Sequence, residues 1–512
     1  MDRPNILFIM ADQMAAPALP LYGHKTVKAP HLTALAERGV VFDAAYCASP
    51  LCAPSRFCMM AGRLPSGIGA YDNAADFPAD TPTFAHYLRL AGYRTALSGK
   101  MHFCGPDQLH GFEERLTTDI YPADYGWTPD WERPENRPSW YHNMLSVVQA
   151  GPCVRSNQLD YDEEVVFAAT RHLFDMARGA DKRPFCMVVS LTHPHDPYAI
   201  LPEYWDRYEG VEIDMPSVEI APEDQDPHSR RLRHVSDMDR HSLAPEQIRR
   251  ARRAYYGAIS YVDDQVGKLL AALKDSGLAD DTIVVFTGDH GDMLGERGLW
   301  YKMSFFEWAA RVPLIVSAPG RFEPRRVGQA VSHVDLLPTL TEIAHGGDAP
   351  DYATPIDGRS LMPHLEGGDG HDEAFGEYLA EGAIAPILMI RRGPLKYVAS
   401  APDPEQLYDL SRDPGERINL AADPAWADIL AGFRDEAARR WDADALHSAV
   451  IASQRRRRLV AAALMKGEHT SWDFQPVRDA GRQYMRNHLD LDDLERRSRL
   501  PVPAVGPEMA AD

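Results

Sequence analysis

Charged and imidazole side chains follow directly after two apolar runs of this sequence. Asp12 and Gln13 come after the run 5–11, and the motif Asp289-His290-Gly291-Asp292 comes after the run 282–287. If both runs are strands of an open α/β sheet, their carboxyl ends lie at the edge where ligands bind. The two motifs can then converge on one polar site, although the same residues could also only cap strand ends.

Two other segments place lysine and histidine in a similar context. Lys100 and His102 lie two residues apart on a predicted extended segment, so their side chains point the same way. His195 follows the apolar run 185–192. Lysine can bind anions and histidine can move protons, but an isolated lysine is usually a surface residue, so these residue types alone do not assign a role.

The elements that must position these groups alternate along the first part of the chain. Apolar runs at 5–11, 94–98, 185–192, 282–287 and 312–317 are typical of buried strands, and a long helical pattern spans 246–277. This order predicts an α/β fold with a large, mostly parallel sheet and helices on both faces. The aromatic, proline-rich loop of about 105–160 is too long for a simple connection and is expected to line a site.

The pattern changes after residue 360. Short antiparallel strands are predicted within 377–397 and 406–410, and a helix that covers them over 424–441. We therefore predict three parts, namely a catalytic α/β domain over 1–365, an α+β subdomain over 366–445 and a helical tail over 446–512. The run Arg455-Arg456-Arg457-Arg458 is expected to be a subunit contact or a solvated helix face.

The balance of charged residues limits the kinds of molecule that the protein is expected to bind. The chain has 54 Lys and Arg against 75 Asp and Glu, a formal net charge of −21. Such a balance argues against nucleic acid and anionic membranes and fits a cationic substrate. The sequence shows no apolar run long enough to cross a membrane and no export signal, and its six cysteines are scattered without a CxxC pair. We therefore expect reduced thiols and a cytoplasmic protein.

One motif decides the family. Cys52-Ala53-Pro54-Ser55-Arg56, followed by Ala61-Gly62-Arg63, resembles the signature of the formylglycine-dependent sulfatases of the alkaline phosphatase superfamily. The order of motifs fits that family over about residues 4–350. The resemblance implies that Cys52 is oxidised to formylglycine by a separate formylglycine-generating enzyme. The alternative for Cys52 is a small buried hydrophobic residue or an inert thiol.

Such a modification makes chemical sense for a sulfate ester. The ester is negatively charged and repels anionic nucleophiles, so a strong nucleophile and several cations are needed. An aldehyde hydrate offers two hydroxyl groups on one carbon, of which one can attack sulfur and expel the alcohol. The other can then lose its proton and eject sulfate as the aldehyde reforms, which divides one difficult step into two.

The resemblance also implies a divalent metal ion. Asp12, Asp289, His290 and the oxygen of the modified Cys52 would form its ligand shell and polarise the nucleophile. Many sulfatases carry Asp and Asn where this chain has Gln13 and His290. Oxygen ligands favour Ca²⁺ or Mg²⁺ and imidazole favours Mn²⁺, so we expect Ca²⁺ or Mn²⁺.

Further catalytic roles follow from the same resemblance. Arg56, Lys100 and Lys302 would surround the sulfate with three cations, as the charge of the transition state requires. His102 would act near the formylglycine as a base. His195 would face the sulfate or the leaving oxygen, whereas His193 is more consistent with a structural role.

Within this family, the sequence is similar to the choline sulfatases over nearly its full length. The similarity rests on segments such as Tyr125-Gly126-Trp127-Thr128-Pro129-Asp130-Trp131, Trp140-Tyr141-His142-Asn143 and Tyr484-Met485-Arg486-Asn487-His488. It implies choline O-sulfate as substrate. Choline carries a quaternary ammonium group, which aromatic faces and carboxylates bind.

Six residues are considered for binding this substrate. Trp127 would form the cage, with His142 or Trp131 beside it, and Asn73 would hold the ester end. Glu381 and Asp492 are the candidate carboxylates. By resemblance, the tail crosses to a neighbouring subunit, so Asp492 would complete another protomer's pocket in a homo-oligomer, a dimer or a tetramer.

Three alternatives stay open from the sequence. The chain could be a sulfatase for another small substrate, or a phosphonate or phosphodiester hydrolase on the same fold. It could also be a choline-binding pseudoenzyme with an unconverted Cys52.

Overall fold

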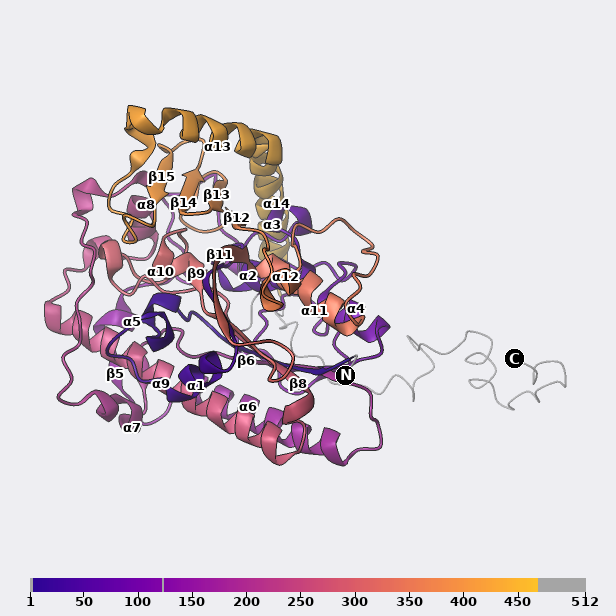
Figure 1. The fold of residues 1–512 in the computed structure, drawn as a ribbon. Helices are drawn as coiled ribbons and strands as arrows, with labels where there is room; N and C mark the ends of the chain where they lie inside the picture. Colours follow the sequence, from indigo (N-terminus) through magenta and orange to yellow (C-terminus); the bar gives the residue numbers. More distant parts are fainter. Residues whose placement is uncertain (1–2, 122–123, 468–512) are drawn as a thin grey trace. The chain divides into compact units, whose positions relative to one another are not determined.

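The protein is represented by a computed structural model that describes residues 3–121 and 124–467. Two larger sheets, a two-stranded sheet of β5 Gly151–Pro152 and β7 Ala199–Ile200, and the helices around them make up the described part of the chain (Figure 1). No helix in the described ranges has the length and apolar character needed to cross a membrane.

The central sheet has nine strands in the order β11-β2-β10-β8-β1-β6-β3-β4, and β9 pairs with β2. Neighbours β8, β1, β6 and β3 all run parallel, and Ile6 of β1 lies between Cys186 of β6 and Ile283 of β8. The strands are β1 Asn5–Ala11, β2 Val40–Tyr46, β3 Arg94–Gly99, β4 Glu114–Arg115, β6 Phe185–Leu191, β8 Thr282–Gly288, β9 Arg311–Val312, β10 Leu314–Ser317 and β11 Arg325–Ser332. The predicted α/β fold with a large, mostly parallel sheet is confirmed.

One predicted strand is divided. The apolar run 312–317 forms β9 and β10, separated by Pro313, and β10 runs antiparallel to both β2 and β8. Proline has no backbone N–H to donate to a neighbouring strand, which explains the break.

Helices cover both faces of the central sheet (Figure 1). One group is α1 Pro30–Glu37, α6 Asn157–Arg178 and α9 Pro245–Asp275, which pack against one another. The other group is α2 Cys52–Ala61, α4 Phe84–Leu90 and α11 Leu336–Ala344. The buried side chains of α9 recur at intervals of three and four residues, as in Ala251, Tyr255, Ile259, Val262 and Val266, which directs one apolar face to the core.

The second sheet is antiparallel, with strands β12 Glu373–Tyr378, β13 Ile387–Arg392, β14 Leu395–Ala399 and β15 Gln406–Asp409 in sequence order. Gly393 has a φ of 54° in the tight turn between β13 and β14, a conformation that glycine adopts without strain. Two helices follow, α13 Ala427–Arg440 and α14 Ala443–Leu464. The predicted antiparallel strands and the helix that follows them are therefore present.

Candidate active site

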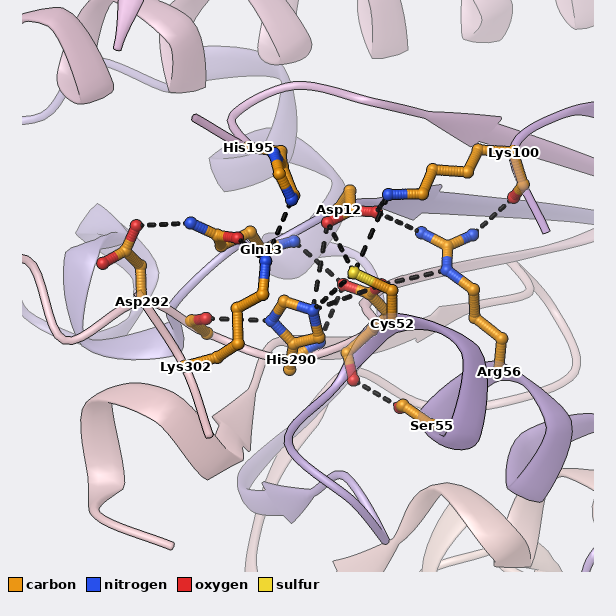
Figure 2. Close-up of polar contacts among 12 residues, drawn as sticks. Asp12, Gln13, Cys52, Ser55, Arg56, Lys100, His195, His290, Asp292 and Lys302 are labelled. Atoms are coloured by element: carbon orange, nitrogen blue, oxygen red, sulfur yellow. Dashed lines mark hydrogen bonds and ion pairs between the residues drawn. The ribbon is translucent and has the colours of Figure 1, made fainter. Parts of the chain in front are cut away.

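Four neighbouring parallel strands deliver the polar groups predicted from the sequence. Asp289 and His290 follow β8, Asp12 follows β1, His195 comes four residues after β6, and Lys100 follows β3. Because these strands are adjacent and parallel, their carboxyl ends meet at one edge of the sheet. Figure 2 shows the side chains converging there around Cys52.

Cys52 is the first residue of α2, a helix whose ten residues are all buried. Its sulfur lies 3.2 Å from Nε2 of His290 and 3.8 Å from Oδ1 of Asp12. Burial and the nearby Asp12 carboxylate raise the pKa of Cys52 to about 12, so the unmodified thiol is protonated near neutral pH.

Arg56 lies one turn further along α2 and binds the carboxylates instead of facing the cavity. Its guanidinium donates to Oδ2 of Asp12 and to Oδ2 of Asp289, both at 2.9 Å, and to Oγ of Ser190 at 2.8 Å. The side chain is completely buried. Arg56 therefore positions the two carboxylates, which differs from the direct sulfate contact expected of it.

A group of donors suited to a metal ion forms at this edge. One atom from each of Asp12, Cys52, Asp289 and His290 lies within 4.8 Å of the others. Nδ1 of His290 contacts the carbonyl oxygen of Gly291 at 3.0 Å, which leaves Nε2 facing the group. Burial lowers the pKa of His290 to about 4, so the imidazole is neutral and able to act as a ligand. Two carboxylates and one neutral imidazole fit a divalent cation.

Gln13 does not join this group. Its Nε2 donates to Oδ2 of Asp292 at 2.7 Å, and its Oε1 accepts from Nζ of Lys302 at 2.5 Å (Figure 2). The amide thus connects Asp292 to Lys302. Where many sulfatases carry a second carboxylate, this chain has a residue that orients a lysine.

Two lysines point at the sulfur and its surroundings. Nζ of Lys100 lies 3.7 Å from the sulfur of Cys52 and 4.4 Å from the ring centre of Tyr121, and it also pairs with Asp12. Nζ of Lys302 donates to Nε2 of His195 at 2.9 Å. Burial and Lys302 hold the pKa of His195 well below its usual range. The ring of His195 is therefore neutral, and its Nε2 accepts the hydrogen bond from Lys302.

His102 is buried beside the cavity with both ring nitrogens lacking a hydrogen-bond partner among the described residues. Its backbone has a positive φ of 61° and donates through its N–H to Oδ2 of Asp119 at 2.7 Å. Burial and Lys100 lower the pKa of His102 to about 3. Asp119 was not predicted from the sequence, since a carboxylate in a long loop gives no periodic or motif signal.

A cavity of about 240 Å³ opens from these groups. Two kinds of side chain line it. The first are Cys52 and the lysines and histidines near it, namely Lys100, His102, His195 and Lys302. The others, some of which lie directly against the first, are Asn73, Tyr121, Trp127, Trp140, Tyr141, His142, Asp196, Pro197 and Glu381. We call these two groups of residues the anion end and the cation end. The loop of about 105–160 supplies five of the lining aromatic and imidazole side chains, which confirms that it lines a site.

The cation end has stacked aromatic rings and a buried glutamate, Glu381. Trp127 and Trp140 lie almost parallel, with ring centres 6.2 Å apart, and Tyr141 meets Trp140 edge to face at 4.3 Å. Glu381 is buried, and its Oε2 has no hydrogen-bond partner in the described part of the chain. Burial raises the pKa of Glu381 to about 7.

Most of the predicted substrate-binding residues, Asn73 of the ester end included, meet at one cavity. Asn73, Trp127, His142 and Glu381 all line the cavity. Trp131 does not, because its indole N–H donates to the carbonyl oxygen of Ala380 at 2.9 Å and its ring is buried, so Trp140 takes the place considered for it. Asp492 lies outside the described residues.

Two further predictions are settled by local contacts. His193 contacts Oδ2 of Asp162 through Nδ1 at 2.7 Å and does not line the cavity, as a structural histidine would. The expectation of a solvated or intersubunit arginine run is wrong for Arg457, which is buried against Asp72 of the same chain.

The fold and this edge together define a hydrolase that acts on anionic esters, because buried lysines, a metal-binding group and a helix-borne cysteine surround one cavity. The comparisons agree. Residues 4–346 match the family model described as "Sulfatase", residues 295–441 match "N-sulphoglucosamine sulphohydrolase, C-terminal", and residues 448–500 match "Choline sulfatase enzyme C terminal". The chain belongs to the sulfatase family and is a sulfuric ester hydrolase.

Relatives support this assignment over most of the chain. A choline-sulfatase of Rhizobium meliloti (strain 1021) is 48% identical over 98% of this chain and 99% of its own. An arylsulfatase of Clostridium perfringens is 27% identical over 82% of this chain and 90% of its own. The solved structure of a phosphonate monoester hydrolase of Agrobacterium radiobacter matches with a TM-score of 0.68 and 25% identity, over 87% of this chain and 96% of that one.

Proposed function

We propose that this sulfatase hydrolyses choline O-sulfate to choline and sulfate. The observation that carries the proposal is that one cavity is lined both by lysines and histidines and by aromatic rings and a carboxylate. Choline O-sulfate carries a group for each, an anionic sulfate at one end and a quaternary ammonium at the other. The near full-length similarity to a choline-sulfatase supports this substrate.

The cation end suits a quaternary ammonium group for two reasons. Such a cation has no N–H to donate, so it is bound by the faces of aromatic rings and by carboxylates rather than by directed hydrogen bonds. Trp127 and Trp140 offer ring faces, and Glu381 offers a carboxyl oxygen with no partner among the described residues. We assign Asn73 and His142 to the same pocket, because both line it.

The anion end supplies the charge that the reaction needs. Lys100 and Lys302 would bind the sulfate oxygens, and their ammonium groups would stabilise the negative charge that develops in the transition state. His195 and His102 are buried, and their lowered pKa values keep both rings neutral near pH 7. We assign His195 to the leaving oxygen and His102 to the region of residue 52, where a neutral imidazole can hold or move a proton.

Two groups would complete this site. Conversion of Cys52 to formylglycine by a separate generating enzyme would supply a hydrated aldehyde as nucleophile. A divalent ion, Ca²⁺ or Mn²⁺, would supply Lewis acidity at the same position. Asp12, Asp289 and His290 would hold the ion, and Arg56 would keep the two carboxylates in place through its paired hydrogen bonds.

We also infer the setting in which the protein works. The six cysteines are all free, which is consistent with the reducing cytoplasm. We propose domain boundaries near residues 365 and 445. We also propose a homo-oligomer in which Asp492 reaches the cation end of a neighbouring protomer. Analytical ultracentrifugation, together with choline binding by an Asp492→Asn variant, would test that arrangement.

The test of the proposed function compares three substrates on one purified sample. Sulfate release from choline O-sulfate is measured against release of nitrophenol from a nitrophenyl sulfate and hydrolysis of a phosphonate monoester. We expect kcat/KM to be highest for choline O-sulfate, by about 100-fold or more, because only that ester fills the cation end. A preference for nitrophenyl sulfate or the phosphonate ester would refute choline O-sulfate as substrate while leaving the family intact.

The same sample must be checked for conversion. A peptide mass for the segment that contains Cys52 distinguishes thiol from aldehyde. Choline binding without turnover and with only thiol present would support the pseudoenzyme alternative. Aldehyde present and all three substrates untouched would contradict the proposed chemistry.

A further inference from the structure

Helix α14 lies behind the cation end of the cavity without lining it. Its buried face carries Leu446, Val450, Gln454 and Arg457, spaced by three and four residues, and the helix packs against the 3₁₀ turn Tyr125–Trp127. No described residue of α14 is among those that line the cavity. Any effect of this helix on substrate must therefore pass through the residues that it contacts.

Arg457 connects α14 to one wall of the cavity. Its two terminal nitrogens donate to the two carboxylate oxygens of Asp72 at 2.5 and 2.7 Å, and both side chains are buried. Oδ1 of Asp72 also accepts from the N–H of Ala74 at 3.0 Å, which fixes the turn around Asn73. Such a two-point pair between an arginine and a carboxylate restricts orientation as well as distance.

Asn73 links that turn to the helix that carries the nucleophile. Its Oδ1 accepts from the backbone N–H of Ala53 at 3.0 Å, next to Cys52, and its side chain lines the cavity. The orientation of Asn73 is therefore set from one side by α2 and from the other by the Asp72–Arg457 pair.

Gln454 connects α14 to the opposite wall. Its Oε1 accepts from the backbone N–H of Trp131 at 2.9 Å, and the indole N–H of Trp131 donates to the carbonyl oxygen of Ala380 at 2.9 Å. Ala380 directly precedes Glu381, whose Oε2 has no hydrogen-bond partner in the part of the chain that the structure describes. The same helix face therefore holds Asn73 through Arg457 and the segment of Glu381 through Gln454 and Trp131.

We propose that Arg457 and Gln454 of α14 are positioning residues that set the spacing of Asn73, Trp127 and Glu381 and so determine selectivity for a quaternary-ammonium ester. This proposal rests on the proposed function and adds that helix α14 positions the residues that select the substrate. The segment that matches the choline sulfatase C-terminal model begins at residue 448, within this helix, which is consistent with a role tied to that substrate.

The test uses full-length converted enzyme and three variants of the same helix. Arg457→Met removes the buried pair, Arg457→Lys keeps the charge without the two-point geometry, and Arg455→Met removes only an exposed pair with Glu132. For each, kcat and KM are measured with choline O-sulfate and with a nitrophenyl sulfate. The inhibition constant of choline against nitrophenyl sulfate turnover reports the cation end alone.

We expect Arg457→Met to lower kcat/KM for choline O-sulfate by about 100-fold, mainly through KM, and to weaken choline inhibition to a similar degree. Turnover of nitrophenyl sulfate should fall by about fivefold or less. Arg457→Lys should recover part of the selectivity because it restores the charge. Arg455→Met should behave as wild type, since exposed ion pairs contribute little.

Equal losses on both substrates in a folded Arg457→Met protein would overturn the proposal, as would unchanged choline inhibition. If that variant does not fold, Trp131→Phe is tested instead, because it removes the indole N–H that holds Ala380 and keeps an aromatic ring at this position. It should weaken choline inhibition by about tenfold, and wild-type inhibition would refute the proposal. A wild-type enzyme without preference for choline O-sulfate would instead refute the proposed function, whatever Arg457 does.

Discussion

The two ends of the cavity are built in different ways. The anion end takes its side chains mainly from four adjacent parallel strands and from α2, and those groups bind one another closely, as in the contacts of Arg56 with Asp12 and Asp289. The cation end takes most of its side chains from a long loop, and Glu381 comes from the segment after β12, whereas Asn73 precedes α4 and Asp196 and Pro197 follow β6. One oxygen of Glu381 has no hydrogen-bond partner among the described residues.

This difference indicates how chemistry and selectivity are divided. Strand ends in a packed sheet hold charged groups at fixed positions, as a charge-stabilising site requires. Loop residues depend on whatever packs behind them, here the second sheet and α14. Substitutions at the cation end are therefore expected to alter substrate specificity, and substitutions at the anion end to alter the rate for every ester. The variants below test this separation.

The largest effect is expected from Cys52→Ala. Removal of the precursor of the nucleophile should lower sulfate release from every ester by about 10⁴-fold or more. Cys58→Ala is the matched control, because Cys58 is buried in the same helix and does not line the cavity. Full turnover by Cys52→Ala, with choline O-sulfate or nitrophenyl sulfate, would exclude the proposed nucleophile.

Lys302→Met should give the next largest effect and should not discriminate between substrates. Loss of one preorganised cation lowers kcat by about 100- to 1000-fold, or about 3–4 kcal/mol. Steady-state kinetics on both esters, with circular dichroism to verify folding, provide the measurement. A loss confined to choline O-sulfate would show that the two ends are not separate.

Trp127→Ala should have a smaller and selective effect. Removing one ring face from the cation raises KM for choline O-sulfate by about 10- to 50-fold, or about 2 kcal/mol, and leaves kcat for nitrophenyl sulfate within about threefold. Trp205→Ala serves as control, since Trp205 packs against Arg253 away from the cavity. Comparable losses on both esters would assign Trp127 to folding rather than to cation binding.

The smallest effect concerns the protonation of Glu381. Burial, together with the smaller effect of Asp72, raises the pKa of Glu381 to about 7, while its own backbone N–H and Lys302 oppose this increase. Below that pH the free carboxyl group is protonated, whereas a bound quaternary ammonium favours the carboxylate. Choline affinity should therefore increase by up to about tenfold between pH 6 and pH 8, with release of a proton.

Calorimetric titration with choline at three pH values, in two buffers of different ionisation enthalpy, measures both quantities. Glu381→Gln should bind choline more weakly and without this pH dependence. A pH-independent affinity in the wild type would contradict the assignment. The free energy of unfolding depends on pH in the opposite direction to choline affinity. A carboxyl group whose pKa is raised in the folded state stabilises the fold when it is protonated. The unligated protein should lose stability as the pH rises from about 4.5 through 7.

Much of the anion end could be predicted because its signals are local. Asp12, Lys100 and Asp289 each follow an apolar strand directly, so the motif and the strand that positions it are adjacent in sequence. Arg56 shows the limit of such reasoning. The signature identified the residue, but only the packing shows that its guanidinium binds carboxylates instead of lining the cavity.

The sequence indicated that aromatic residues of the long loop line the cavity, but not which of them do so. An aromatic loop beside a family motif indicated a site for a cation, yet Trp131 and Trp140 are equally plausible from composition. The structure selects Trp140, because the indole N–H of Trp131 is used to hold Ala380. No periodic pattern reveals such a contact, since it joins residues about 250 positions apart whose distance is determined by other elements.

By itself, the sequence determined the fold class, the family and the chemistry at the strand ends, because hydrophobic periodicity and short motifs act over a few neighbouring residues. Only the tertiary structure decided which aromatic rings face the cavity, that Gln13 orients Lys302, and that Arg457 is a buried partner of Asp72. Those outcomes depend on which distant side chains compete for the same hydrogen bonds and volume. That competition is resolved only when the whole chain is packed.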